Sequence, residues 1–151
     1  MISIQLETFA GILPELKKVV VEHHKEVALD QGIIKLDPQY DTYLLREQAG
    51  ETHVVTMRDA GELIGYYIGF IAPGLHYKEC LTYVVDIFYV APKYRRQGIA
   101  KEALQFLEKD LLRRGVRKVY MGSWVKADCS PLFESMGYIK AEVVFTKLLG
   151  G

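Results

Sequence analysis

The sequence has no surplus of charge of either sign, because Lys and Arg together number 19 and so do Asp and Glu. A protein that binds nucleic acid usually has a basic excess, so we expect no nucleic-acid partner. No apolar run reaches the roughly 18 residues that a membrane span requires. The start of the chain also lacks the basic and apolar segments of a signal peptide. We therefore expect no membrane partner.

Cysteine is scarce, and Cys80 and Cys129 have neither metal-ligand spacing nor the density of a disulfide scaffold. We expect both thiols to be free and buried, in a reducing cytoplasmic setting, with no metal bound. Half of the residues are hydrophobic and a quarter are charged, which is typical of a globular protein. A length of 151 residues suits one domain, spanning residues 1–151.

Hydrophobic periodicity and turn residues predict an alternation of strands and helices. The expected elements are a strand at 2–6, helices at 12–28 and 38–50, strands at 52–59, 63–72 and 80–90, a helix at 98–115, a strand at 117–124, a short helix at 130–136, and one or two strands within 138–149. Hairpin strands are antiparallel, whereas a strand–helix–strand crossover is parallel and right-handed. The sequence therefore predicts an α/β fold with a mixed, mostly antiparallel sheet and helices on both faces.

The stretch YVAPKYRRQGIAKEALQFLEKDLLRRG, residues 89–115, joins a hydrophobic strand to an amphipathic helix through a basic turn. The first N–H groups of a helix have no partner within it and attract anions. Gly98 allows a ligand to approach the backbone closely, and Arg95 and Arg96 add positive charge. The turn alone leaves two interpretations open. It binds a pyrophosphate, or Gly98 merely eases the turn and both arginines are solvated.

Residues 90–100, V-A-P-K-Y-R-R-Q-G-I-A, resemble the acetyl-CoA loop of the GNAT N-acetyltransferases. The family pattern is Arg/Gln-x-x-Gly-x-Gly/Ala, between a strand that ends Val-x-Pro and a long helix. Arg95, Gly98 and Ala100 match its three key positions. The segment SPLFESMGY resembles the family's A-x-x-L-Y-x-x-x-G-F, and the expected element order agrees over nearly the whole chain. The sequence also resembles GNAT proteins encoded in bacteriophage and prophage genomes, for which the setting is the host cytoplasm.

This resemblance implies a three-layer acyl-CoA N-acyltransferase fold and acetyl-CoA as cosubstrate. Loop amides would bind the pyrophosphate, the preceding strand would pair with pantetheine, and an N–H near Val90 would polarise the thioester carbonyl. The residues assigned to acetyl-CoA are Phe88, Tyr89, Val90, Arg95, Arg96, Gln97, Gly98, Ile99, Ala100 and Lys101. The implied reaction is direct attack on the thioester by a primary amine of a small molecule, a lysine side chain or a protein N-terminus.

Asp86 is our candidate for the general base, because it is a carboxylate within the apolar strand TYVVDIFYV and diamine acetyltransferases of the family have an acidic residue at a similar position. Unless it is paired, such a carboxyl should have a raised pKa. A purely structural cap or salt bridge is the alternative. Glu26, His76 and Tyr77 are candidates for acceptor contacts, the last two in an expected turn. His23 and His24 are further titratable candidates, although such residues are more often packed or solvated.

One position departs from the family pattern, because Phe133 replaces the tyrosine that serves as general acid. Phenylalanine cannot donate a proton. Another residue such as Tyr120, Tyr138 or Ser123 could serve, or water could protonate the thiolate. The alternative function is a catalytically weak acetyl-CoA-binding module that acts through protein interaction. The short final segment also leaves an exposed sheet edge, which predicts a homodimer.

Overall fold

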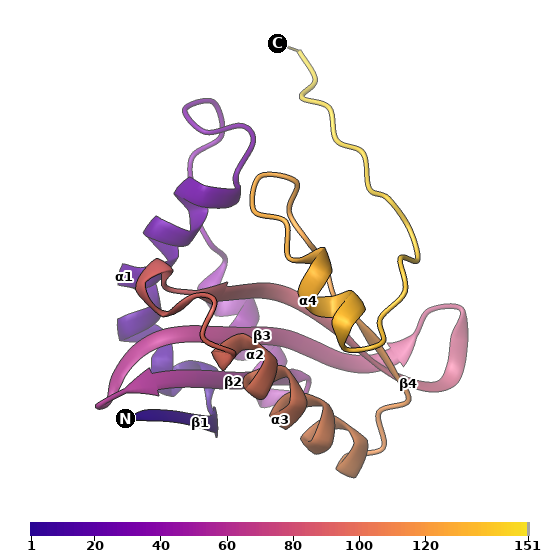
Figure 1. Ribbon diagram of the computed structural model, residues 1–151. Coiled ribbons are helices and arrows are strands. Elements are labelled where there is room, and N and C mark those ends of the chain that lie inside the picture. The colour runs from indigo at the N-terminus through magenta and orange to yellow at the C-terminus, as the bar shows by residue number, and fades with distance from the viewer. Residues whose placement is uncertain (151) are drawn as a thin grey trace.

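Helices cover both faces of a five-stranded sheet in the computed structural model, which describes residues 1–150 (Figure 1). In chain order the elements are β1 (Ile2–Glu7), α1 (Phe9–Val27), α2 (Tyr40–Gln48), β2 (Thr52–Asp59), β3 (Glu62–Gly74), β4 (Tyr77–Val90), the 3₁₀ turn η1 (Pro92–Tyr94), α3 (Ile99–Arg113), β5 (Lys118–Tyr120) and α4 (Ser130–Ser135). Gly151, the end of the expected domain, lies outside the described residues.

The strands follow the order β1-β2-β3-β4-β5, so each strand lies beside its neighbour in sequence. The first four pair antiparallel, whereas β4 and β5 pair parallel across the α3 crossover. The predicted mixed, mostly antiparallel sheet is confirmed. β1 and β5 are the two edges.

Each face of the sheet has its own hydrophobic core. The α1/α2 core contains Phe9, Ile12 and Leu16 packed against Tyr66 and neighbouring sheet residues. The α3/α4 core, on the opposite face, places Leu104, Leu107 and Leu111 of α3 against the sheet and includes Phe133 of α4. The amphipathic patterns of the helices therefore correctly predict their buried faces, and the three-layer arrangement is confirmed.

A buried polar cluster attaches α3 to β2. Asp110 of α3 lies 2.8 Å from His53 Nε2, and Arg114 donates to the same carboxylate at 2.7 Å. Burial alone would raise the pKa of Asp110, but hydrogen bonds from His53, Arg113 and Arg114 outweigh burial and lower the pKa to about 2. Because Asp110 stays ionised and paired, α3 is fixed on the sheet, and its first turn is fixed with it.

A β-bulge interrupts β4 at Asp86. Ile68 of β3 pairs with Ile87, but the next residue, Gly69, pairs with Val85, so Asp86 is the extra residue. A bulge bends its strand and often lies beside a functional site. Beyond this point β4 has no partner on its other side, because its pairing with β5 covers only Thr82 to Val84. β5, at three residues, is shorter than the predicted strand at 117–124.

The strands expected within residues 138–149 are absent. This segment is extended but forms no strand, and Figure 1 shows it leaving α4 and running away from the sheet. The sequence has a strand-like pattern, but a strand also requires a backbone partner, and within residues 1–150 the segment has none. The prediction was therefore wrong for the single chain.

We expect Gly69→Ala to destabilise the fold at the bulge. A Cβ at residue 69 would lie only 2.4 Å from the ring of Tyr83, whose side chain is fully buried. Overpacking of this kind costs roughly 1–3 kcal/mol of the free energy of unfolding, measured by urea denaturation. Gly122→Ala is the matched control, since a Cβ there meets no atom within 4 Å. Equal stabilities of the two variants would contradict this account of the bulge.

Candidate active site

The turn between η1 and α3 presents unpaired backbone N–H groups. Within residues 1–150, the N–H groups from Gly98 to Lys101 donate to no protein acceptor, and the first helical bond from this turn runs from Glu102 N to Gly98 O at 3.0 Å. Gly98 has a φ of +81° and no atom within 4 Å of a Cβ placed on it. These amides lie at the N-terminus of a long helix, where the helix dipole places partial positive charge. The geometry fits a pyrophosphate.

The open side of β4 lies beside this turn. Ala91 N donates to Ile64 O of β3 at 2.8 Å. The peptide that joins Val90 to Ala91 therefore directs the Val90 carbonyl away from β3, and in an extended strand the Val90 N–H points the same way. Phe88, two residues earlier, has the same orientation. The backbone groups of Phe88 and Val90 thus face the gap that β5 leaves.

Arg95 lies differently from the sequence expectation. Its Nε donates to Val90 O at 2.8 Å, and its Nη2 lies 2.8 Å from Glu26 of α1. The guanidinium also lies 5.7 Å from the ring centre of Tyr89. Arg95 thus connects the end of β4 to α1, while Arg96 and Lys101 remain exposed at the turn. The sequence predicted that Arg95 adds positive charge beside the ligand, but it did not predict the bonds to Val90 and Glu26.

A buried histidine lies beneath the bridge. His23 of α1 is only 4% exposed, its Nδ1 is 2.9 Å from the hydroxyl of Tyr66, and its ring lies 4.9 Å from that of Tyr89. Burial lowers the pKa of His23 to about 4, against an opposing effect of Glu26. His23 is therefore neutral at pH 7 and packed. Its neighbour His24 is half-buried.

Asp86 is exposed, in contrast to the apolar surroundings that its strand suggested. The hydroxyl of Tyr43, on α2, donates to its Oδ2. Tyr43 itself stacks on Phe9 at 4.7 Å, and burial followed by the bond to Asp86 raises the pKa of Tyr43. The bulge therefore directs the carboxylate toward α2. No sequence pattern indicated Tyr43, because its position opposite β4 depends on how α2 packs.

The candidate acceptor residues are not brought together. Glu26 lies at the site, in the ion pair with Arg95. His76 and Tyr77 are exposed in the turn and first residue of β4, at the end of the strand opposite Val90 (Figure 1). Asp86 lies nine positions after Tyr77 along β4, which at about 3.3 Å per residue is roughly 30 Å.

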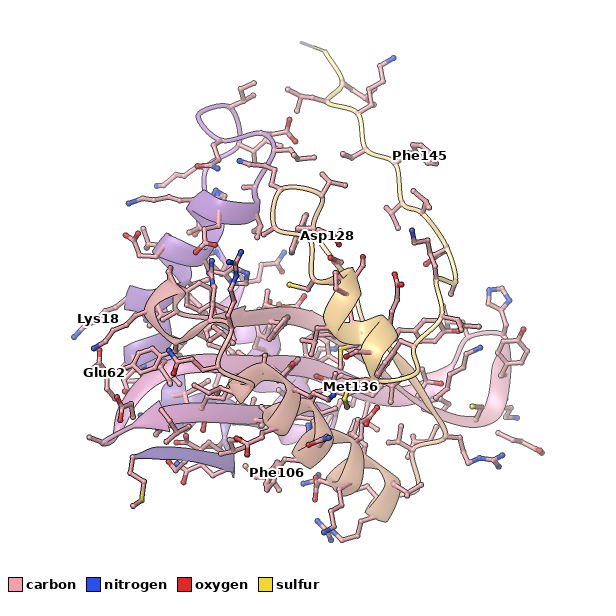
Figure 2. All side chains as sticks on the ribbon, viewed as in Figure 1. Lys18, Glu62, Phe106, Asp128, Met136 and Phe145 are labelled. Carbon is pink, nitrogen blue, oxygen red and sulfur yellow. The ribbon has the colours of Figure 1, made fainter. Side chains whose placement is uncertain are left out.

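The residues named as substitutes for the missing general acid have other contacts. Phe133 is buried against Phe88, with ring centres 6.1 Å apart. Tyr138 donates to Glu108 of α3 at 2.8 Å, and burial and this bond raise the pKa of Tyr138. Ser123 donates to Asp128, a residue labelled in Figure 2, at 2.9 Å. Tyr120 is half-buried at the end of β5.

The cysteines are free and half-buried rather than fully buried. Burial, followed by the nearby charge of Asp128, raises the pKa of Cys129. Its thiol is therefore protonated at neutral pH, in agreement with its interpretation as a packing residue.

No helix within residues 1–150 is long and apolar enough to cross a membrane. In the same part of the chain, no group of three or more His, Cys, Asp or Glu side chains is arranged to hold a metal ion.

Solved structures with acetyltransferase names share this fold at low sequence identity. A ribosomal-protein-alanine N-acetyltransferase from Brucella melitensis biovar Abortus has a TM-score of 0.77 at 19% identity, covering 100% of this chain and 99% of that one. An aminoglycoside acetyltransferase from an uncultured soil sample has a TM-score of 0.74 at 13% identity, covering 98% and 96%. A predicted acetyltransferase from Clostridium acetobutylicum, with acetyl-CoA, has a TM-score of 0.73 at 13% identity, covering 99% and 97%.

The fold and the family match together define an acetyl-CoA-dependent acyltransferase. Residues 19–138 match the sequence model of the acetyltransferase (GNAT) family, and this match spans most of the chain. The protein therefore belongs to the GNAT acetyltransferase family, as the loop and the element order predicted. No curated protein sequence gives a significant match.

We expect His23 to make stability fall on acidification. Between its ordinary pKa of 6.5 and the folded value of about 4, the unfolded chain binds a proton that the folded chain does not, so the free energy of unfolding decreases as pH falls. At pH 5 the loss attributable to His23 is about 2 kcal/mol. The free energy of unfolding, measured by urea denaturation from pH 7.5 to 5, should lose this pH-dependent decrease in His23→Gln and keep it in His24→Gln. An unchanged dependence of the unfolding free energy on pH in His23→Gln would contradict the assignment to His23.

Proposed function

We propose that the protein transfers the acetyl group of acetyl-CoA to a primary amine by direct attack. The observation that supports this most is the set of unpaired N–H groups from Gly98 to Lys101, at the end of a strand with an open side. These amides would hold the pyrophosphate together with those of Arg96 and Gln97. Exposed Arg96 and Lys101 would add positive charge, and Arg95 would act from a distance by fixing Val90.

The open strand suggests how the rest of the cosubstrate binds. Phe88 and Val90 direct backbone groups into the gap beside β4, so pantetheine could pair there as an added strand. The Val90 N–H would then stabilise the negative charge that develops on the thioester oxygen. The backbone of Tyr89 is paired with Tyr66 of β3. Its side chain packs in the α1/α2 core and would contribute through packing.

Acetyl-CoA supplies a thioester, and transfer forms a C–N bond and breaks the C–S bond. An amine attacks only when it is deprotonated, so a base beside the open strand is required. We propose Asp86, acting through a water molecule, because its carboxylate is exposed on the bulge and one oxygen is positioned by Tyr43. The proton released from the amine would pass to this carboxylate.

The leaving group presents a different requirement. Phe133 has no proton to donate, and Tyr138 and Ser123 donate to carboxylates elsewhere. We therefore propose that water protonates the departing thiolate. The same substitution supports the second candidate function, an acetyl-CoA-binding module with weak catalysis.

The acceptor remains a primary amine of a small molecule, a lysine or a protein N-terminus. Solved structures of this fold include proteins named for ribosomal-protein alanine and for aminoglycosides, so the fold alone does not choose. The carboxylates of Glu26 and Asp86 would favour a cationic amine. Contacts with His76 and Tyr77 require an acceptor long enough to run along β4.

We also propose that the chain forms a single domain over residues 1–151, acts in the cytoplasm, is encoded by a bacteriophage or prophage, forms a homodimer and has no nucleic-acid partner.

Gly98→Glu should abolish or strongly weaken acetyl-CoA binding. The side chain would place a bulky negative charge among the unpaired amides, and we expect an affinity loss of at least about 10-fold in calorimetry. Gly115→Glu is the matched control at the other end of α3. Gly115 also has a positive φ, +89°, and no atom within 4 Å of an added Cβ, so backbone strain is comparable. Similar losses in both variants would contradict the proposed site.

Asp86→Asn should lower kcat with an amine acceptor by roughly 10²–10⁴-fold while leaving acetyl-CoA affinity unchanged. Asparagine keeps the shape and can still accept from Tyr43, but it is not a base. Tyr43→Phe is the control, because it removes the bond and keeps the carboxylate, and we expect a loss of only a few fold. If wild-type protein binds acetyl-CoA but acetylates no member of an amine panel, the binding-module candidate replaces the transferase.

A further inference from the structure

The N-terminus of α1 is capped by a side chain of another helix. The Thr8 hydroxyl accepts from Gly11 N at 3.0 Å, which leaves the N–H groups of Phe9 and Ala10 without an acceptor in their own helix. Both donate to the carboxylate of Glu47 on α2, one to each oxygen, and the Ala10 bond is 3.1 Å long. The first turn of α1 has no acidic residue of its own, so α2 supplies the negative charge that the helix dipole favours there.

α2 is a short helix whose position depends on contacts with the rest of the chain. It has 9 residues, none of them fully buried, and no side-chain hydrogen bond caps its own N-terminus. Isolated helices of this length are marginal in water. Within residues 1–150, the two Glu47 bonds are the only hydrogen bonds that join α2 to α1. Glu47 is therefore the polar contact that sets where α2 lies against α1.

The same face of α2 carries the residue that meets the candidate base. Tyr43 lies four positions before Glu47, so the two side chains are neighbours on the helix surface. The Tyr43 ring stacks on Phe9, with ring centres 4.7 Å apart and an angle of 7° between the planes. Its hydroxyl donates to Asp86. Phe9 thus contacts α2 twice, through its ring and through its N–H, and both contacts locate the Tyr43 hydroxyl.

We propose that Glu47 is a positioning residue for Asp86, because its cap on α1 fixes α2 where Tyr43 can donate to the carboxylate. A displacement of α2 by about 1 Å would take the Tyr43 hydroxyl out of hydrogen-bond range. The effect of Glu47 on acetyl transfer rests on the proposed function, in which Asp86 is the base. Its effect on the position of α2 does not.

The first test is amide hydrogen exchange, measured by NMR on Glu47→Gln. Glutamine has one acceptor oxygen and no charge, so at least one of the Phe9 and Ala10 N–H groups loses its partner. We expect these two amides and those of α2 to exchange at least about 10-fold faster than in the wild type. Glu51→Gln is the matched control, since it makes the same change just after α2 and removes only an exposed ion pair with Arg46. Unchanged exchange in α2 of Glu47→Gln would overturn the proposal.

The second test asks whether Glu47 acts through Tyr43. The value of kcat with an amine acceptor is measured for Glu47→Gln, Tyr43→Phe and the double variant. We expect a similar loss of a few fold in each single variant, an unchanged acetyl-CoA affinity, and a double variant no slower than Tyr43→Phe. A cap that only stabilised the fold would leave kcat unchanged, and independent effects would multiply in the double variant. Either result would overturn the proposal.

Failure of the proposed function is recognised separately, by a wild type that acetylates no amine. The free energies of unfolding of the same variants then decide the structural claim. Once Glu47→Gln has released α2, the bond from Tyr43 to Asp86 is already lost, so the double variant should be destabilised by less than the sum of the single changes. Additive losses of stability would overturn the proposal whether or not the protein is a transferase.

Discussion

The β-bulge at Asp86 is the constraint on which the geometry of the site depends. A single extra residue in β4 shifts the pairing with β3 between Ile68 and Gly69, and it is accommodated by the close approach of Gly69 to the Tyr83 ring. Beyond the bulge, β4 no longer pairs with β5. The same residue therefore exposes a carboxylate and marks where the open side of β4 begins.

Arg95 connects this opened strand to α1. Its bonds to Val90 O and Glu26 join the end of β4 to α1, and neutral His23 packs below against Tyr66 and Tyr89. Such a bridge fixes the peptide after Val90, which in turn orients the Val90 N–H. Precise orientation matters because a donor stabilises developing charge only at hydrogen-bond distance. The first arginine of the loop is thus bonded to the end of β4 and to α1.

The sequence predicts this fold well wherever local patterns determine the structure. The faces of α1 and α3, the hairpin of β2 and β3, and the turn at Gly98 all follow from apolar spacing or from a glycine at positive φ. Features that depend on distant parts of the chain were not predictable. Tyr43 meets Asp86 across more than forty residues, and Arg95 meets Glu26 across almost seventy. Residues 139–149 have a strand pattern, but the pattern does not say whether a partner edge exists in the same chain.

Phe133 occupies the position where the family pattern has a tyrosine, and the proposed reaction would tolerate the loss of that proton donor better than the loss of a base. The phenyl ring packs against Phe88 and so supports the opened part of β4. A tyrosine here would support the strand less well if its hydroxyl were buried without a hydrogen-bond partner. A thiol has a pKa of about 8.5, whereas an alkyl amine such as that of lysine has one of about 10.4. At neutral pH the thiolate is therefore already a competent leaving group, and the ammonium must still lose its proton before attack. In the proposed reaction, catalysis would then depend mainly on the base Asp86 and on the Val90 N–H, both of which are positioned by the bulged strand.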